Sequence, residues 1–230
     1  LALYDTGLTR SVLAGRDLQE AKQGHTMGKL TQALFYASDF ADRLEQEMIP
    51  ALRAGSVVLT DRYIYSLIAR AIVRGADPQW SRQVYGFAVI PDLILYMHAD
   101  LPTLIPRVLA RGGFDYWESG CDYIHAESRY ECFVRHQDAL LGVFRRMIDE
   151  YGFVVVDANR PVREVFEDLR RHIEAVVADM KPRTRDVRDT EVEPELFPEM
   201  TVPPPAASRQ TRSVAEIVAD LLEALQDERG

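Results

Sequence analysis

The segment that decides the fold is IPALRAGSVVLTDRY, residues 49–63. It joins the end of a helical pattern, which runs from Lys29 to Ala54, to the short run Val57-Val58-Leu59-Thr60. Gly55 between them is a typical helix stop, because glycine readily adopts the left-handed conformation that ends many helices. Apolar residues at consecutive positions are typical of a strand buried on both faces of a parallel sheet. The segment therefore predicts a helix, a tight stop and a buried strand.

The helix predicted over 29–54 carries aliphatic side chains at spacings of three and four residues. We expect one buried stripe, formed by Leu30, Leu34, Ala37, Ala41, Leu44, Met48 and Leu52. Tyr36, Asp39, Phe40 and Arg43 share another face by the same spacing. That face is either part of a binding site or partial core with a solvated Asp–Arg edge.

Two further apolar runs, at 93–97 and 153–156, also predict buried strands. Helical patterns lie between and after them, at about 101–110, 128–151 and 162–180. Strands that alternate with helices in this order predict an α/β fold with a doubly wound parallel sheet, in three layers. In such folds, functional residues lie at the carboxyl ends of the strands.

The composition fits one globular domain with an appendage: 230 residues, of which 47% are hydrophobic and 27% charged. The net charge of -9 opposes binding of nucleic acid polymers. No apolar run approaches the roughly 20 residues of a membrane-spanning helix, so we expect no membrane partner. Two cysteines, Cys121 and Cys132, make no disulfide framework, which predicts a cytoplasmic protein. Because the chain starts at Leu1 rather than at Met, we expect a longer gene product.

The end of the chain differs in composition from the domain predicted over 1–181. Residues 182–205 contain six of the twelve prolines and 186–199 carry six acids, so 182–212 reads as a linker. Residues 213–230 have the apolar spacing of an amphipathic helix, and Ser213 with Glu216 fits a capping box.

Asp61 and Arg62 follow the first predicted strand directly. A carboxylate at a strand end can hold a hydrated Mg²⁺ beside phosphates, and a guanidinium can clamp a phosphate with two hydrogen bonds. The alternative reading is a surface ion pair after a strand.

Several segments together resemble the thymidylate kinase family of P-loop nucleoside monophosphate kinases. They are the stretch 34–39, the helix, strand and Asp-Arg-Tyr of 49–63, Ser66, the strand of 91–96, Arg107 with Arg111, and 156–158. The resemblance runs from about residue 9 to 178. It implies a P-loop NTPase fold and transfer of the ATP γ-phosphoryl group to a nucleoside 5′-monophosphate, with dTMP as the expected acceptor.

The resemblance also implies roles for individual residues. Arg62 and Arg10 bind the acceptor phosphate, Asp61 organises Mg²⁺ and its waters, and Arg107 and Arg111 close over the phosphoryl group from a lid at about 107–127. The acceptor site is completed by Tyr36, which stacks on the base, and by Asp39, Phe40, Ser66, Arg70 and Tyr116. Asn159 lies beside the adenine of ATP. A homodimer is common in the family and is expected here.

The sequence departs from the family pattern in two places. The phosphate-binding loop G-x-x-x-x-G-K-[S/T] is absent from the 230 residues, and residues 1–4 resemble the tail of the helix that follows it. We therefore expect a protein that lacks the first strand and is neither stable nor active as printed. Phe40 stands where the family has a base-reading Arg, and Arg70 with Ala71 where Tyr and Gln or Thr are common.

Alternatives remain open at this point. The chain is a kinase for dTMP or for another small phosphate acceptor, or a non-catalytic nucleotide-binding relative that acts as an interaction module. Tyr116 is either a pocket residue or a packed loop anchor. The pairs Cys121/His125 and Cys132/His136 suggest zinc, but their spacing is unlike that of common zinc fingers.

Overall fold

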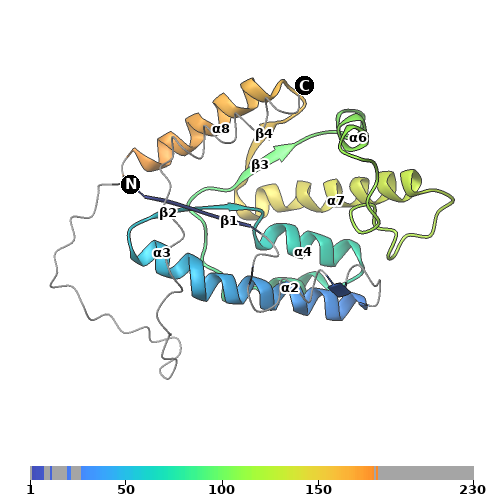
Figure 1. The fold of residues 1–230 in the computed structure, drawn as a ribbon, viewed down its shortest axis with the longest axis horizontal. Helices are drawn as coiled ribbons and strands as arrows, with labels where there is room; N and C mark the ends of the chain where they lie inside the picture. The colour runs from blue at the N-terminus through green and yellow to red at the C-terminus, as the bar shows by residue number, and fades with distance from the viewer. Residues whose placement is uncertain (1, 8–10, 12–19, 22–26, 179, 181–230) are drawn as a thin grey trace. The chain divides into compact units, whose positions relative to one another are not determined.

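The computed structural model describes residues 2–7, 11, 20–21, 27–178 and 180 (Figure 1). Arg10, the linker and the helix predicted over 213–230 lie outside these residues. The elements in chain order are β1 (Leu3–Gly7), α2 (Lys29–Arg43), the π-helical turn η1 (Leu44–Met48), α3 (Ile49–Arg53), β2 (Val57–Asp61), α4 (Ile64–Val73), α5 (Pro78–Val84), β3 (Leu95–His98), α6 (Leu101–Ala110), α7 (Arg129–Tyr151), β4 (Val154–Asp157) and α8 (Val162–Val177). They fall into two compact units, which we describe one at a time.

The first unit contains the described residues 2–6 and 43–61. Strands β1 and β2 pair in a two-stranded sheet, and the Val57 amide donates to the Ala2 carbonyl at 2.8 Å. Helix α3 ends as predicted at Gly55, whose φ is 79°. Helix, stop and strand therefore follow one another within 49–61 as the sequence predicts.

The expectation that residues 1–4 end a helix is wrong, because Leu3 and Tyr4 belong to strand β1. Residues two apart in a strand share a face. Tyr4 and Thr6 accordingly both donate their hydroxyls to Oε2 of Glu47, at 2.8 and 3.0 Å. So short a segment does not hold a helix by itself, whereas pairing with β2 satisfies its backbone groups.

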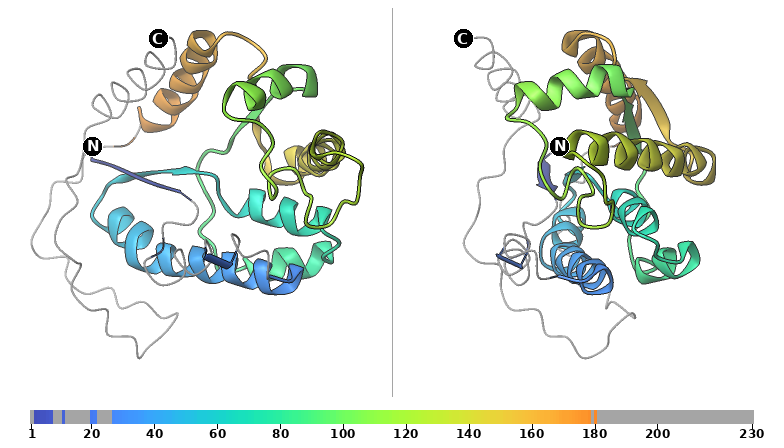
Figure 2. Two further views of the ribbon diagram at one scale, coloured as in Figure 1. Left: turned by 45° about the vertical axis from the view of Figure 1, so that its right-hand side comes forward. Right: turned by 90° about the vertical axis from the view of Figure 1, so that its right-hand side faces the viewer.

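The second unit contains the described residues of 7–42 and 62–180. Strands β3 and β4 are parallel, with Leu95 opposite Val154 and His98 opposite Asp157. Helices α6 and α7 connect these two strands, as a parallel pair requires. Figure 2 shows α7 beside α4, and the two helices are in contact. The described residues therefore have mixed helices and parallel strands.

Caps explain why the predicted helix boundaries in this unit hold. The side chain of Asp100 accepts from the Thr103 amide at the start of α6, and that of Ser128 accepts from the Glu131 amide at the start of α7. Gly152 ends α7 in the left-handed conformation, with φ 66°. Helices α4 and α5, by contrast, are not among the elements that the sequence predicted.

The predicted burial of the strands is wrong in this structure. Leu59 in β2, Met97 in β3 and Val155 in β4 are 40%, 57% and 47% exposed. Each sheet contains two strands among the described residues. A run of apolar residues in a strand does not by itself mean that other elements cover both faces of that strand.

The predicted stripe of the long helix is also wrong in part. Leu30, Leu34 and Leu52 are exposed, whereas Tyr36 and Phe40 are buried. Aromatic rings bury more area than aliphatic side chains. The ring of Phe40 packs at 5.1 Å from Tyr63 and at 5.9 Å from Tyr85, so this face turns inward.

Candidate active site

The end of strand β2 carries the Asp61–Arg62 pair that the sequence singled out. Both side chains are exposed. Arg62 has φ 65°, the only positive φ of a non-glycine residue among the described residues. A left-handed arginine costs about 1–2 kcal/mol, and such strained residues cluster at functional sites. The strain places Arg62 at a sharp turn between β2 and α4.

The turn is anchored on the residue that follows it. Tyr63 has an extended backbone before α4, and its hydroxyl donates to the Val89 carbonyl at 2.7 Å. The hydroxyl of Ser66 donates to the Tyr63 carbonyl at 2.9 Å. In this structure Ser66 therefore stabilises the first turn of α4.

The predicted acceptor face of α2 is buried and holds a carboxylate. Tyr36 is 8% exposed, and Asp39 and Phe40 are fully buried. Oδ1 of Asp39 accepts from the Ser11 amide at 3.2 Å. Phe40 lies between Tyr63, Tyr85 and Phe87, so it packs as core. Burial raises the pKa of Tyr85, and the neighbouring Tyr36 and Asp39 raise it further.

The sequence did not predict a cluster that fixes the segment between α6 and α7. We call it the Arg74 cluster, and its members are Arg74, Trp117, Asp122, Tyr123 and His136. Arg74, just after α4, donates from Nε and Nη2 to the two carboxylate oxygens of Asp122 at 2.7 and 3.0 Å. Its Nη2 also donates to the Trp117 carbonyl at 3.2 Å.

His136 completes the Arg74 cluster from helix α7. Its Nδ1 lies 2.8 Å from the Tyr123 hydroxyl, and the guanidinium of Arg74 lies over the Tyr123 ring. Burial lowers the pKa of His136 to about 4, and the nearby charges of Arg74 and Arg70 act in the same direction. Burial also raises the pKa of Tyr123 to about 12. Both groups are therefore neutral at physiological pH.

The two predicted lid arginines have different surroundings. Arg107 lies inside α6, and its Nη1 donates to the Ala158 carbonyl at 2.8 Å. Arg111 follows α6 and is largely exposed, 3.8 Å from the carboxylate of Glu118. The ring of Tyr116 packs edge-on against Trp117, with centroids 5.3 Å apart.

Asn159 lies in the turn after β4. Its backbone and side-chain nitrogens donate to Oδ1 of Asp157, and its own side-chain oxygen accepts from the Asp100 amide. Asp157 thus caps this turn.

The zinc hypothesis finds no support in the described residues. They hold no group of three or more His, Cys, Asp or Glu side chains placed to bind a metal. Nδ1 of His136 is already engaged by Tyr123, and both thiols are free. Burial raises the pKa of Cys121 to about 11, so it is not a thiolate at neutral pH.

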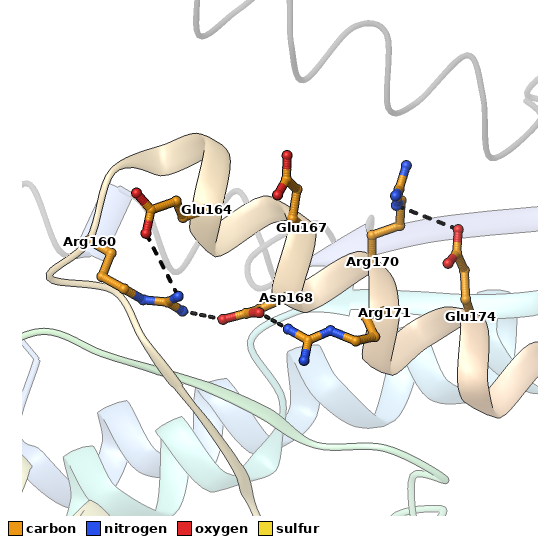
Figure 3. Close-up of a pocket in the computed structure, with 7 residues that line it drawn as sticks. All are labelled: Arg160, Glu164, Glu167, Asp168, Arg170, Arg171 and Glu174. Carbon is orange, nitrogen blue, oxygen red and sulfur yellow. Dashed lines mark hydrogen bonds and ion pairs between the residues drawn. The ribbon is translucent and has the colours of Figure 1, made fainter.

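A hollow on helix α8 is lined only by charged side chains, shown in Figure 3: Arg160, Glu164, Glu167, Asp168, Arg170, Arg171 and Glu174. All of them except Glu167, which pairs with Arg163, pair with one another. Asp168 binds both Arg160 and Arg171, and Arg170 lies 3.6 Å from Glu174. Because these charges compensate each other at the surface, we interpret the hollow as a solvated helix face.

Parallel strands with connecting helices, and a strained Asp-Arg turn at a strand end, define the class of the protein as α/β. Within the described residues, no helix is long and apolar enough to cross a bilayer.

The comparisons with known proteins specify this class. The family model "Thymidylate kinase" matches residues 9–169. The chain is 31% identical to the "Probable thymidylate kinase 2" of Saccharolobus solfataricus over 156 residues. These residues are 67% of this chain and 73% of that protein. It is 31% identical over 173 residues to the "Thymidylate kinase" of Shouchella clausii, with 72% and 76% covered. It is 36% identical over 139 residues to the "Probable thymidylate kinase" of Pyrococcus abyssi, with 60% and 62% covered.

The chain belongs to the thymidylate kinase family. The predicted family is therefore confirmed, and it implies a P-loop NTPase fold. The relatives indicate an enzyme of the nucleoside monophosphate kinase class. The chain spans less than two thirds of some of these relatives, 62% of the Pyrococcus abyssi protein among them.

Proposed function

We propose that the complete protein transfers the γ-phosphoryl group of ATP to dTMP, giving dTDP and ADP. The observation that carries this proposal is the family match over residues 9–169, which includes the strained Asp61–Arg62 turn. Relatives from an archaeon and a bacterium carry the name thymidylate kinase, which supports dTMP as acceptor. No observation favours a non-catalytic binding module or another acceptor.

Phosphoryl transfer depends mainly on positioning and on neutralising charge. Arg62 is proposed to bind the acceptor phosphate, with Arg10 on its other side. The exposed guanidinium of Arg62 suits a bidentate contact with a phosphate. Arg107 and Arg111 are proposed to close over the transferring group, for which Arg107 must release the Ala158 carbonyl.

The residues present fit Mg²⁺ with ATP. Asp61 offers an exposed carboxylate at the end of β2, and within the described part of the chain no side chain hydrogen-bonds or ion-pairs with it. Mg²⁺ is usually held by one or two carboxylates together with substrate phosphates, rather than by a cage of protein ligands. Bound there, the ion would neutralise phosphate charge. Asp61 would orient its waters.

The acceptor base is proposed to lie against Tyr36, with Asp39, Phe40, Ser66, Arg70 and Tyr116 around it. Asn159 is proposed to border the adenine of ATP. Because Phe40 is buried in the core and the Ser66 hydroxyl donates to the Tyr63 carbonyl, we expect these two to shape the pocket rather than to contact the nucleotide.

The finer architecture is part of the proposal. We propose a three-layer, doubly wound kinase domain over 1–181 with a lid at about 107–127, a linker at 182–212 and a helix at 213–230. We also propose a cytoplasmic homodimer.

Steady-state kinetics of the complete gene product with Arg62→Ala test the proposal. We expect kcat/KM for dTMP to fall by orders of magnitude, because the phosphate loses its clamp. Arg53→Ala is the matched control, since Arg53 is exposed in the last turn of α3, and we expect it to leave turnover unchanged. Near-normal activity of Arg62→Ala would remove Arg62 from the active site. Absence of turnover by the wild-type protein with every nucleoside monophosphate would overturn the proposed reaction.

A further inference from the structure

The two cysteines of the chain lie on helix α7 and on the segment that precedes it. Cys132, in the first turn of α7, is 4% exposed, and its thiol donates to the Ile124 carbonyl at 3.4 Å. Cys121 is half-buried in the segment between α6 and α7. Both thiols are free, and the proposed reaction uses neither of them.

The turn that contains Cys121 runs along the face of α7 that carries Cys132. At its start, a Cβ added to Gly120 would lie 2.8 Å from Cγ and Nδ1 of His136. At its end, Ile124 donates its amide to the Gly120 carbonyl at 2.9 Å, and its own carbonyl accepts from Cys132. His136 and Cys132 are four residues apart on α7, so they share a face and lie about 6 Å apart along the axis. The turn therefore spans the distance from His136 to Cys132, with Cys121 inside it.

The titration of Cys121 agrees with this placement. Burial raises the pKa of Cys121 to about 11, and a hydrogen bond with the Cys132 thiol raises it further. A disulfide joins Cα atoms that are about 4–7 Å apart, so two cysteines with adjacent thiols can form one with little movement of the backbone.

We propose that Cys121 and Cys132 form a reversible intramolecular disulfide, which locks the segment between α6 and α7 onto helix α7. The oxidant is a small disulfide of the glutathione type. The thiolate of Cys121, the more exposed of the two, attacks one sulfur of the oxidant and releases one glutathione thiolate. The Cys132 thiolate then attacks Sγ of Cys121 and releases the second glutathione. The two cysteines thereby lose two electrons and two protons, and the oxidant becomes two glutathione thiols.

The disulfide would reinforce contacts that already hold this segment. The Arg74 cluster holds one side of it, and the Gln137 side chain donates to the Glu118 carbonyl at 3.2 Å. The bond closes a loop of 12 residues, 121–132. Closing such a loop removes conformational freedom mainly from the unfolded chain, so oxidation should stabilise the folded protein. In a reducing environment the pair stays as two thiols.

The test oxidises the complete protein with glutathione disulfide and maps its tryptic peptides by mass spectrometry without reduction. Residues 112–129 and 130–135 form separate tryptic peptides with one cysteine each. We expect these two peptides to appear joined, and lighter by two hydrogens than the sum of the two. Between pH 9 and pH 7 the bond should form about tenfold more slowly for each unit of pH, because the thiolate is the attacking species.

Thermal unfolding measures the effect of the lock. We expect the oxidised protein to unfold at a temperature about 5–10 °C above that of the reduced protein, and dithiothreitol to reverse the difference. Cys121→Ala is the matched control, because it keeps Cys132 but cannot form the bond, and the same treatment should leave its unfolding temperature unchanged.

Four outcomes would overturn the proposal. They are glutathione attached to Cys121 without a link to Cys132, a link between two copies of the chain, thiols that resist oxidation in the folded protein at pH 9, and a cross-linked protein that unfolds at the temperature of the reduced one. None of these measurements depends on turnover, so the disulfide and the proposed reaction can fail separately.

Discussion

Two regions of the molecule are built from the same Arg–Asp chemistry and differ in where it lies. In the Arg74 cluster, the side chains of Arg74 and Asp122 are 7% and 9% exposed. On helix α8, Asp168 binds Arg160 and Arg171, whose side chains are 35% and 68% exposed. Water screens the second set and is excluded from the first. The buried pair therefore ties the end of α4 to the segment between α6 and α7, whereas the ion pairs of Asp168 with Arg160 and Arg171, which we call the exposed ladder, are screened by water.

Breaking the buried pair should have the largest effect. We expect Arg74→Met to lower the free energy of unfolding by about 3–5 kcal/mol, because Asp122 is left as a buried charge without a partner. Urea denaturation measures this loss. The double variant Arg74→Met with Asp122→Leu removes both charges and should recover much of it. A loss below about 1 kcal/mol for Arg74→Met would show that water reaches the cluster.

The next effect concerns the backbone that passes beside the cluster. Gly120 has φ +68°, and an added Cβ would lie 2.8 Å from Cγ and Nδ1 of His136. We expect Gly120→Ala to destabilise the protein by about 2–3 kcal/mol, through backbone strain together with the clash. Chemical denaturation measures the change.

Gly142→Ala is the matched control for Gly120→Ala. Gly142 lies inside α7 with no atom within 4 Å of an added Cβ. It should stabilise the protein by about 0.5–1 kcal/mol, because alanine favours the helix. If both variants shift stability equally, the contact of Gly120 with His136 is not what constrains the loop.

The same comparison shows what the sequence can and cannot predict. Helix α6 and the start of α7 follow from local signals, the caps Asp100 and Ser128, which act within three residues of themselves. The turn at Asp61–Arg62 is equally local, since a strand end and two adjacent side chains define it. The parallel pairing of β3 with β4 follows from the helices between them.

The Arg74 cluster was not predicted because its contacts are distant in the chain. Arg74 meets Asp122 across 48 residues, and Tyr123 meets His136 across a loop and the first turns of α7. No spacing rule joins such positions. Strand burial was predicted wrongly for a related reason, because it depends on which elements cover a face and not on the strand's own residues.

Acid should weaken the buried region selectively. The pKa of His136 is lowered from 6.5 to about 4 in the folded protein, so the unfolded chain binds more protons between these values. Its contribution to stability is complete above pH 6.5 and is lost as the pH falls towards 4. Arg74, Arg70 and Asp122 are the charged groups that act on this ring.

Urea denaturation at pH 7 and pH 5 measures the contribution of His136. We expect the wild type to lose about 2 kcal/mol more than His136→Gln over this interval, since Gln does not titrate. Carboxylates titrate in both proteins, so their contributions to the loss cancel in the difference. Identical losses would mean that His136 accepts its proton without opening the cluster.

The smallest effect belongs to the exposed ladder. Asp168→Ala removes the carboxylate that joins Arg160 and Arg171, yet both arginines retain water, and Arg160 keeps Glu164 at 3.9 Å. We expect the free energy of unfolding to fall by less than about 1 kcal/mol, and by less again in high salt. Denaturation at low and high salt measures both values. A loss as large as that of Arg74→Met, or one that salt does not change, would mean that α8 is covered in the complete protein and that its charges are desolvated like those of the cluster.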